Sequence, residues 1–306
     1  MKRELSLAIL KERQSWSFNQ KYDHAMGVIE QFIGYMGKKH VFVSFSGGKD
    51  STVMMDMVRK FIPDVPVVFA NTGNEFPENV KFCRSMKDKG INFIEVHPKM
   101  TMKQVIQTVG FPIISKEVCS KVNYYLKYPE KLKSNMEIGS WRLPYRYQYL
   151  LNAPYQVSDK CCLILKERPI TEWGKKNKSK PFIGTRAEES KRRSLGWVVS
   201  GGCNILTGSN ISSRPLSIWL KEDVNEYIKQ NNLEISPLYS QDSLPRTGCV
   251  MCGFGCTFDG RISTYKLLKE RYPKYYDLCM NFSNNGYTYQ EVMEELGKRI
   301  HKKILP

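Results

Sequence analysis

The sequence contains no run of about 18 consecutive apolar residues, the length that a membrane-spanning helix needs. No apolar segment of the secretory type follows Met1-Lys2-Arg3-Glu4, so no signal peptide is expected. Histidine is scarce, and its four copies, which form no cluster and receive no role, are His24, His40, His97 and His301. These absences predict a cytoplasmic protein without a membrane span.

Acidic residues are also few. The 30 Asp and Glu residues are outnumbered by 47 Lys and Arg residues, which gives a formal net charge of +17. The basic residues cluster at 175–180, 191–193 and 298–303. Such blocks suit a polyanion, either a phosphorylated nucleotide or a nucleic acid such as tRNA or DNA. The alternative is a solvated basic face, because charge runs commonly lie in loops.

Cysteine, by contrast, is frequent, with nine copies in 306 residues. A chain of this length and a hydrophobic content of 41% can build a core without disulfides. In a reducing compartment, clustered cysteines are better explained as metal or redox ligands than as a disulfide framework.

A glycine-rich segment lies between an apolar strand-like run, 40–45, and a helix-like run that opens at Ser51. Glycines let the backbone approach a phosphate, amide groups point at it, and a helix N-terminus favours negative charge. The segment is not a Walker A loop, because Val43 and Asp50 stand where that loop needs a glycine and a hydroxyl residue. An ordinary Gly-Gly turn is the alternative. The candidate anion-binding residues are Ser46, Gly47, Gly48, Lys49, Asp50 and Ser51.

Helix and strand patterns alternate along much of the chain. Expected strands are 40–45, 65–70, 91–96 and one beginning at 181, and expected helices are 52–62 and 78–89. This alternation predicts an α/β fold with a doubly wound, mostly parallel sheet. Ligands of such sheets bind beyond the carboxyl ends of the strands, where residues 46–51 would lie.

Three regions are expected along the chain. Residues 1–36 form a helical N-terminal extension, 37–245 an α/β nucleotide-binding domain, and 246–306 a Cys-rich segment with helices at 262–282 and 288–300. Within the domain, about 115–160 is expected to be a helical insertion rich in Tyr, Lys and Arg, with Trp141. Its tyrosines could stack nucleic-acid bases, but packing in the core is the commoner role of aromatic residues.

Ser46-Gly-Gly-Lys-Asp-Ser51 resembles the pyrophosphatase loop (PP-loop) of adenine-nucleotide α-hydrolases. This resemblance implies that the loop binds ATP with Mg²⁺ or an adenylyl sulfate (APS or its 3′-phosphate PAPS). Two further loops resemble segments of the PAPS reductase family: Asn71-Thr-Gly-Asn-Glu-Phe-Pro-Glu78, where Asn71 replaces an Asp and Asn79 a Thr, and Gly184-Thr-Arg-Ala-Glu-Glu-Ser190.

Together these loops and a Pro-Leu, Trp, Pro-Leu-Tyr order after them make residues 38–256 similar to PAPS reductases. The resemblance implies a nucleotide site, with Lys49, Asp50 and Arg186 in catalytic roles. Its further nucleotide-contacting positions are Asn71, Thr72, Gly73 and Gly184. Arg186 could hold a phosphate through two hydrogen bonds, as lysine could not. A surface loop that caps a helix is the alternative for 184–190.

The cysteines distinguish branches of this family. A tandem Cys161-Cys162 and a distant Cys249-x-x-Cys252 resemble the [4Fe–4S] signature of adenylyl-sulfate reductases, and Cys256 is a fifth candidate ligand. Chelation by closely spaced residues favours Cys249, Cys252 and Cys256 together with Cys162. The reductase pattern instead favours Cys161, Cys162, Cys249 and Cys252. Both ligand sets remain open. Zinc is the rival metal, since four thiolates suit it too. Cys83, Cys119, Cys203 and Cys279 are expected to be buried small side chains.

Sulfonucleotide reductases also carry a terminal Glu-Cys-Gly-x-His segment, which residues 298–306 do not resemble. Three functions are therefore open. The first is ATP-dependent sulfur transfer to a nucleic acid, with a sulfur-donor protein. The second is reduction of PAPS or APS by an external thiol or electron donor, and the third is a non-catalytic binding module with structural zinc. The sequence does not indicate an oligomeric state.

Overall fold

The computed structural model describes residues 2–132, 142–240, 244 and 247–306. The chain divides into two compact units, which are described separately. Unit 1 comprises Met1–Ala70, Pro77–Val96 and Ile170–Thr247, and unit 2 comprises Asn71–Phe76, His97–Pro169 and Gly248–Pro306. Trp141 and the middle of the expected insertion lie outside the described residues.

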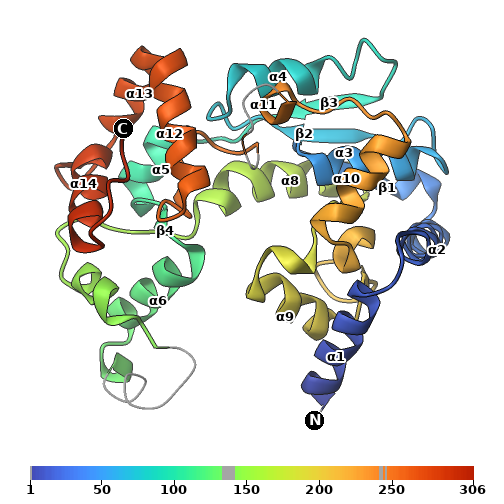
Figure 1. Cartoon of the computed structure of the whole chain (residues 1–306), viewed down its shortest axis with the longest axis horizontal. Helices are drawn as coiled ribbons and strands as arrows, with labels where there is room; N and C mark the ends of the chain where they lie inside the picture. Colours follow the sequence, from blue (N-terminus) through green and yellow to red (C-terminus); the bar gives the residue numbers. More distant parts are fainter. Residues whose placement is uncertain (1, 133–141, 241–243, 245–246) are drawn as a thin grey trace. The chain divides into compact units, whose positions relative to one another are not determined.

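Unit 1 is built on a six-stranded sheet with the order β3-β2-β1-β5-β7-β6. Figure 1 labels the first three of these strands, β3, β2 and β1. All neighbouring strands are parallel except β6 and β7. The strands are β1 (Val41–Phe45), β2 (Val67–Ala70), β3 (Phe93–Val96), β5 (Lys180–Ile183), β6 (Asn204–Ile205) and β7 (Ser212–Ser213). The mostly parallel α/β fold expected from the sequence is confirmed.

The strands form because β-branched and aromatic residues dominate them, and the central ones are buried on both faces. Val43 of β1 pairs with Val67 of β2 and with Phe182 of β5, and none of the three has measurable exposure. The helices and short helical turns of unit 1 are α1 (Lys2–Gln14), α2 (Phe18–Met36), η1 (Lys38–His40), α3 (Lys49–Arg59), α4 (Pro77–Arg84), α8 (Arg168–Lys176, whose first two residues belong to unit 2), η4 (Ala187–Glu189), α9 (Lys191–Ser200), η5 (Pro215–Ile218), α10 (Lys221–Gln230) and α11 (Pro237–Ser240).

The helical N-terminal residues form two helices, α1 and α2. Ser17 breaks them apart and caps α2: its hydroxyl accepts from the Gln20 amide, and the Gln20 side chain accepts from the Ser17 amide. A buried ion pair of 2.8 Å joins Lys21 of α2 to Asp223 of α10. This pair fixes α2 to unit 1 at a point where an unpaired charge would be costly.

Unit 2 consists mainly of helices with two small sheets. Its helices are α5 (Met102–Val109), α6 (Lys116–Lys127), η2 (Tyr145–Leu151), the π-helical η3 (Leu163–Glu167), α12 (Asp259–Arg271), α13 (Pro273–Met280) and α14 (Tyr289–Arg299). Strands β4 (Ile113–Ile114) and β8 (Gly253–Phe254) pair in parallel, and β9 (Ser283–Asn284) and β10 (Tyr287–Thr288) form an antiparallel hairpin. The buried hydroxyls of Tyr265 and Tyr289 lie 3.0 Å apart and link α12 to α14.

The expected single helix at 262–282 is wrong: α12 ends at Arg271, and α13 begins at Pro273. Proline lacks an amide hydrogen and clashes with the preceding turn, so it starts a helix more easily than it continues one. Among the described helices, none is both long and apolar enough to cross a bilayer.

Candidate nucleotide site and cysteine cluster

The segment between β1 and α3 makes a sharp turn that requires glycine. Gly47 has a φ of +72°, and a Cβ atom there would lie 2.6 Å from Asn79 Oδ1 and 2.7 Å from Cys83 Sγ. Asn79 also donates from Nδ2 to the Ser46 carbonyl oxygen across 3.2 Å, which ties the loop to α4. The turn is therefore held by its own backbone geometry and by α4.

The hydroxyls of the loop are engaged with one another. Ser51 Oγ accepts from the Ser46 amide at 3.2 Å, lies 3.1 Å from Ser46 Oγ and donates to the Gly48 carbonyl oxygen at 2.9 Å. Ser51 is buried and Ser46 is exposed. Ser51 thus shapes the loop, whereas Ser46 presents its hydroxyl at the surface.

Helix α3 begins at Lys49, earlier than expected from the sequence, with Gly48 as its N-cap. Lys49 and Asp50 therefore lie in the first turn, where the amide groups have no acceptor within the helix. The Lys49 ammonium donates to Asn225 Oδ1 at 3.1 Å and lies 5.1 Å from the centre of the Tyr239 ring. These contacts hold a positive charge beside the N-terminus of α3.

The guanidinium of Arg186 is held between two carboxylates of unit 1. Its Nε donates to Asp50 Oδ1 at 2.9 Å, and its Nη1 donates to Glu188 Oε2 at 2.6 Å. Glu188 Oε2 in turn accepts from the Lys221 amide at 2.9 Å. The side chain of Arg186 is 12% exposed, whereas those of Asp50 and Glu188 are 22% and 37% exposed, so the guanidinium is largely buried between carboxylates that still reach solvent.

The loop after β5 lies directly against α3. A Cβ atom on Gly184 would stand 2.7 Å from the Asp50 carbonyl oxygen, so only glycine fits. Further along, Ser190 accepts from the Arg193 amide and caps α9, as in the alternative considered for this loop. The structure therefore brings Gly184 and Arg186 to the 46–51 loop and leaves 191–193 exposed.

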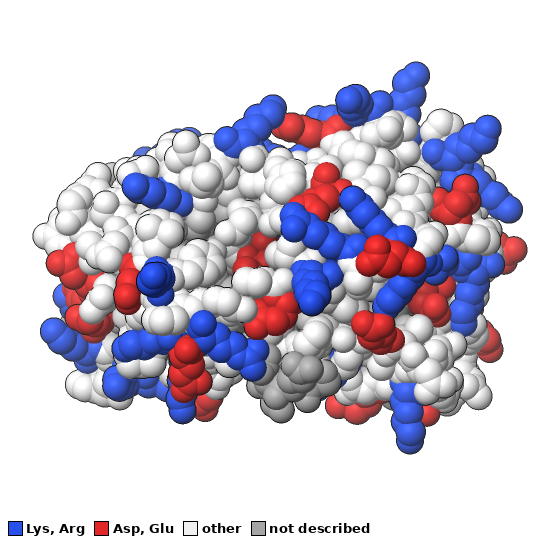
Figure 2. All heavy atoms as spheres, turned by 90° about the horizontal axis from the view of Figure 1, so that it is seen from above, with Lys and Arg blue, Asp and Glu red and all other residues white. Residues whose placement is uncertain are grey.

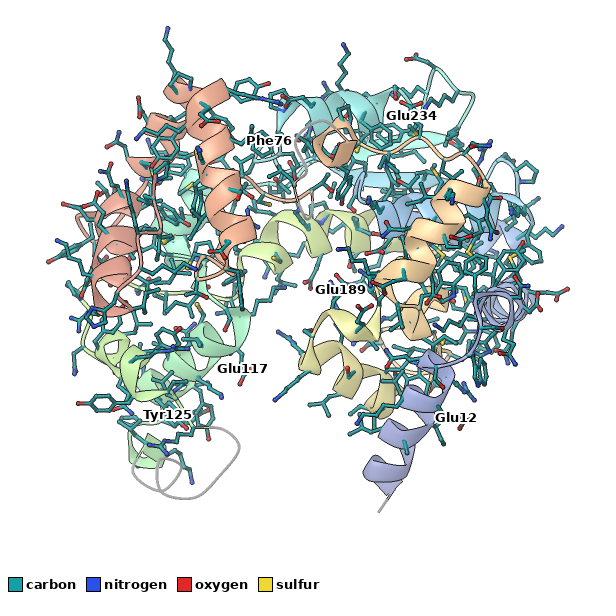
Figure 3. The ribbon with its side chains drawn as sticks, in the orientation of Figure 1. Glu12, Phe76, Glu117, Tyr125, Glu189 and Glu234 are labelled. Carbon is teal, nitrogen blue, oxygen red and sulfur yellow. The ribbon has the colours of Figure 1, made fainter. Side chains whose placement is uncertain are left out.

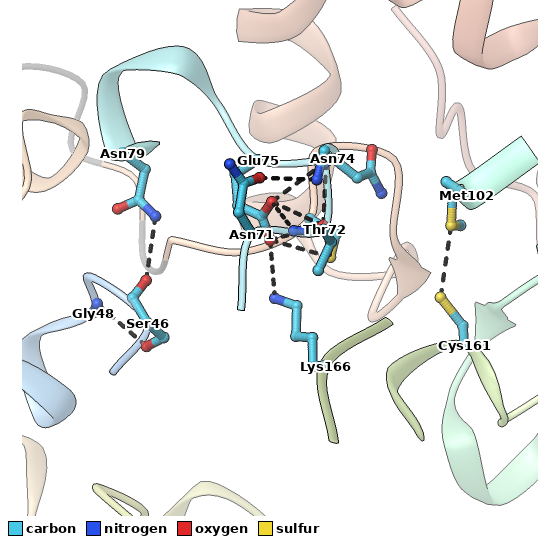
Figure 4. Close-up of polar contacts among 12 residues, drawn as sticks. Ser46, Gly48, Asn71, Thr72, Asn74, Glu75, Asn79, Met102, Cys161 and Lys166 are labelled. Atoms are coloured by element: carbon cyan, nitrogen blue, oxygen red, sulfur yellow. Dashed lines mark hydrogen bonds and ion pairs between the residues drawn. The ribbon is translucent and has the colours of Figure 1, made fainter. Parts of the chain in front are cut away.

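Residues 71–76 form a compact turn in unit 2. Asn71 Oδ1 accepts from the Gly73 amide at 3.0 Å, and Gly73 has a φ of +70°. Glu75 folds back so that its carboxylate accepts from the Thr72 amide at 3.1 Å and from the Thr72 hydroxyl at 2.8 Å (Figure 4). The turn is thus closed by a carboxylate that is almost fully buried.

Glu75 also faces the cysteines of unit 2. The ammonium of Lys166, on η3, lies 3.5 Å from Glu75 Oε1 (Figure 4), and Cys249 Sγ lies 4.0 Å from the same oxygen. Burial works against the charged form of Lys166, but the negative charges of Cys249, Glu75 and Cys162 outweigh it and raise the pKa of Lys166. Sequence reasoning assigned neither Glu75 nor Lys166 a role, although Lys166 follows Cys162 by one helical turn.

The five candidate cysteines do not lie equivalently. Burial raises the pKa of the Cys161 thiol, and three neighbouring thiolates raise it further: Cys249, Cys162 and Cys252. Burial also raises the pKa of Cys249, with Cys162 among its neighbours. Cys256 interacts with Cys252 and with Cys119, which is not a candidate ligand, and burial raises the pKa of Cys256 to about 11. Four thiols from two distant segments therefore lie close enough to interact electrostatically, with Cys256 to one side.

No three His, Cys, Asp or Glu side chains in the described ranges are arranged to hold one metal ion. The remaining cysteines, at 83, 119, 203 and 279, are buried, which confirms the expectation for them. Basic side chains are spread over the face seen in Figure 2, with acidic ones among them. In the 175–180 run, residues 175–178 are exposed.

The sequence matches the model of the phosphoadenosine phosphosulfate reductase domain over residues 40–136 and 146–254. It is 36% identical over 205 residues to a phosphoadenosine 5′-phosphosulfate reductase of Xylella fastidiosa, covering 67% of this chain and 69% of that protein. It is 24% identical over 239 residues to an adenosine 5′-phosphosulfate reductase of Lysinibacillus sphaericus, and the match covers 78% of this chain and 83% of that protein.

An uncharacterized protein of Methanocaldococcus jannaschii is 24% identical over 278 residues, or 88% of this chain. The chain spans 54% of the length of that protein. The domain match extends from the strand before the glycine turn to the second cysteine pair, and so includes all three loops and the four interacting thiols. The chain therefore belongs to the phosphoadenosine phosphosulfate reductase domain family.

Proposed function

We propose that this chain binds an adenylyl sulfate on the 46–51 loop and catalyses reduction of its sulfate group to sulfite. The observation that carries the proposal is the ion pair between Arg186 and Asp50. Asp50 is the only carboxylate in the loop, and Arg186 neutralises it. A phosphate would therefore meet cationic and amide donors here rather than a carboxylate poised to hold a metal ion.

The phosphates are assigned to the first turn of α3. The amides of Lys49, Asp50 and Ser51 point out of the helix N-terminus, and Gly47 and Gly48 allow close approach of the backbone. Lys49 supplies a point charge, and Arg186 supplies a guanidinium with donors left beyond its two carboxylate contacts. Their combined role would be to stabilise negative charge that grows on the leaving nucleotide.

The reaction requires two electrons from outside the site. In the proposed step, a thiol of an external dithiol protein attacks the sulfate sulfur and displaces the nucleotide 5′-phosphate. The second thiol then attacks the resulting sulfur–sulfur bond, which releases sulfite and leaves the donor as a disulfide. The names of the reductase relatives support this choice of substrate.

A [4Fe–4S] cluster is proposed on Cys161, Cys162, Cys249 and Cys252. These four thiols interact with one another, and two lysines, Lys166 and Lys116, lie close enough to offset the charge of a thiolate-ligated cluster. A single zinc ion would need its thiolates about 2.3 Å from one point. The described side chains form no such group, so the choice of the cluster over zinc rests on the resemblance of the cysteine spacing to the [4Fe–4S] signature. The cluster would supply a fixed charge and a redox-capable group beside Lys166.

A second candidate function is ATP-dependent sulfur transfer to a nucleic acid. The formal charge of +17 favours it, since a polyanionic acceptor would be attracted to the chain. ATP would need Mg²⁺ to bridge its phosphates, and Asp50 would have to exchange Arg186 for the metal. This exchange is the step that separates the two candidates.

The test is a binding and turnover panel on anaerobically purified chain. Isothermal titration would compare PAPS, APS and ATP, each with Mg²⁺ and with EDTA, and turnover would be followed as sulfite release with a thioredoxin-type dithiol donor. Metal-independent binding of PAPS or APS with sulfite release supports reduction. Binding of ATP only with Mg²⁺, with release of AMP and pyrophosphate, would overturn it in favour of sulfur transfer.

A further inference from the structure

Helix α6 and the turn η2 pack against each other in unit 2 and divide their tyrosines into two groups. Tyr125 and Tyr147 are 2% and 4% exposed and belong to the core, as expected for aromatic residues. Glu117 and Tyr125 mark the two ends of α6 in Figure 3. Tyr145, by contrast, is 84% exposed, and Tyr128 is 38% exposed. Packing therefore explains only part of the aromatic content.

The half-buried Tyr124 and the exposed Tyr128 lie beside each other and beside a cation. The ring centres of Tyr124 and Tyr128 are 5.2 Å apart, and the Lys127 ammonium is 5.2 Å from the Tyr128 ring. Arg142 and Arg146 flank Tyr145 in the sequence, and both are exposed. Aromatic and basic side chains thus alternate along these two elements.

A buried lysine holds the two elements in place. Lys121 of α6 donates to the Arg142 carbonyl oxygen at 3.0 Å and to Glu117 at 2.7 Å. The contact with Arg142 fixes the backbone that precedes Tyr145. The contact with Glu117 neutralises one of the two carboxylates in the described residues 116–132 and 142–151. The described residues 116–132 and 142–151 contain six Lys and Arg residues against two Glu residues. The region is therefore positively charged.

We propose that this surface, formed by Tyr124, Lys127, Tyr128, Arg142, Tyr145 and Arg146, binds single-stranded nucleic acid. Basic residues attract the phosphate backbone, and every base presents a face that can stack on an exposed tyrosine. A protein partner would favour a patch with fewer solvated charges at its centre. The proposal does not depend on the reaction at the 46–51 loop, because it rests on other residues.

The proposal can be tested with the full chain and a fluorescently labelled single strand of about 16 nucleotides, the upper range of a single binding module. Anisotropy would give the Kd for RNA, DNA and a matched duplex at several salt concentrations. Tyr145→Ala is expected to weaken single-strand binding roughly tenfold, the loss typical of one stacked base. The double variant Arg142→Gln with Arg146→Gln is expected to lower the slope of log Kd against log salt concentration by about one for each phosphate contact that is lost.

Two matched controls identify the surface. Tyr35→Ala removes another exposed tyrosine, 56% exposed on α2, and Lys175→Gln with Lys176→Gln removes two exposed charges from the 175–180 run. Neither should change the Kd more than twofold. Equal losses in the controls, tighter binding of the duplex, or no binding at low salt would overturn the proposal. Circular dichroism would confirm that each variant folds, and PAPS titration would show whether the nucleotide site is intact.

Discussion

Arg186 and Asp50 are 136 positions apart in the sequence, yet the Arg186 Nε atom donates to Asp50 Oδ1 across 2.9 Å. The contact joins the loop after β5 to the first turn of α3. It places a carboxylate where an anionic ligand would otherwise meet an unshielded guanidinium. Binding of a phosphate by Arg186 would thus compete with an interaction inside the protein.

Asp50→Asn is expected to tighten binding of PAPS or APS about threefold to tenfold, because it removes the competing charge while Glu188 still holds Arg186. Arg186→Lys is expected to weaken binding about tenfold to a hundredfold, since lysine cannot make the planar two-bond contact. Titration calorimetry without metal measures both. Weaker binding by Asp50→Asn, restored by extra Mg²⁺, would instead assign Asp50 to a metal.

Gly47→Ala is expected to destabilise the protein by about 3 kcal/mol, which combines the positive φ with overlap at Asn79 and Cys83. Gly90→Ala is the matched control. Gly90 has a φ of +69° with nothing within 4 Å of its Cβ position, so strain alone should cost about 1 kcal/mol. Urea unfolding followed by circular dichroism gives both values. Equal losses would mean that crowding by α4 contributes nothing.

Glu75→Gln is expected to cost about 2 kcal/mol of unfolding free energy, because the buried network would lose its negative charge and one of its two acceptor oxygens, and Lys166 would lose its ionic partner. Glu167→Gln is the control: Glu167 pairs with Lys116 at 3.5 Å but is 57% exposed. That change should cost less than about 0.5 kcal/mol. Chemical denaturation of the metal-free chain measures both, and a smaller effect for Glu75→Gln would contradict the inferred role.

Serine substitution of Cys161, Cys162, Cys249 or Cys252 is expected to abolish most of the bound iron and sulfide after anaerobic purification. Cys256→Ser should retain them, because Cys252 is the one proposed ligand with which Cys256 interacts. Cys279→Ser is a control outside the cluster, on α13. Iron and sulfide analysis with a visible absorbance spectrum provides the readout. One zinc per chain and no sulfide would replace the cluster with a structural zinc site.

The central strands could be predicted because each is a short apolar run bounded by turn residues. Expected strands at 40–45 and 91–96 correspond to β1 and β3. Strands β6 and β7 were not expected, since each has two residues and depends on partners distant in sequence. The break between α12 and α13 was foreseeable from Pro273, whose missing amide favours the start of a new helix.

The sequence indicated which residues belong to the candidate site, but it did not indicate which of them contact one another. Asp50 and Arg186 were both selected from sequence, yet nothing in it indicated that they pair. Glu75 lies inside a recognised loop, but its role in closing the turn depends on the backbone at Thr72. The position of Lys166, one helical turn after the tandem cysteines, could have indicated that its ammonium lies near them. Side-chain partners across a fold depend on tertiary geometry, which no local pattern encodes.

The assignment of residues to the two units has a consequence for how the protein can be dissected. Unit changes occur after residues 70, 76, 96, 169 and 247, so the backbone passes from one unit to the other five times. No single cut separates them, and neither can be expressed as one uninterrupted fragment. Deletion mapping would therefore remove parts of both units at once, and point substitutions are the appropriate way to assign roles to either.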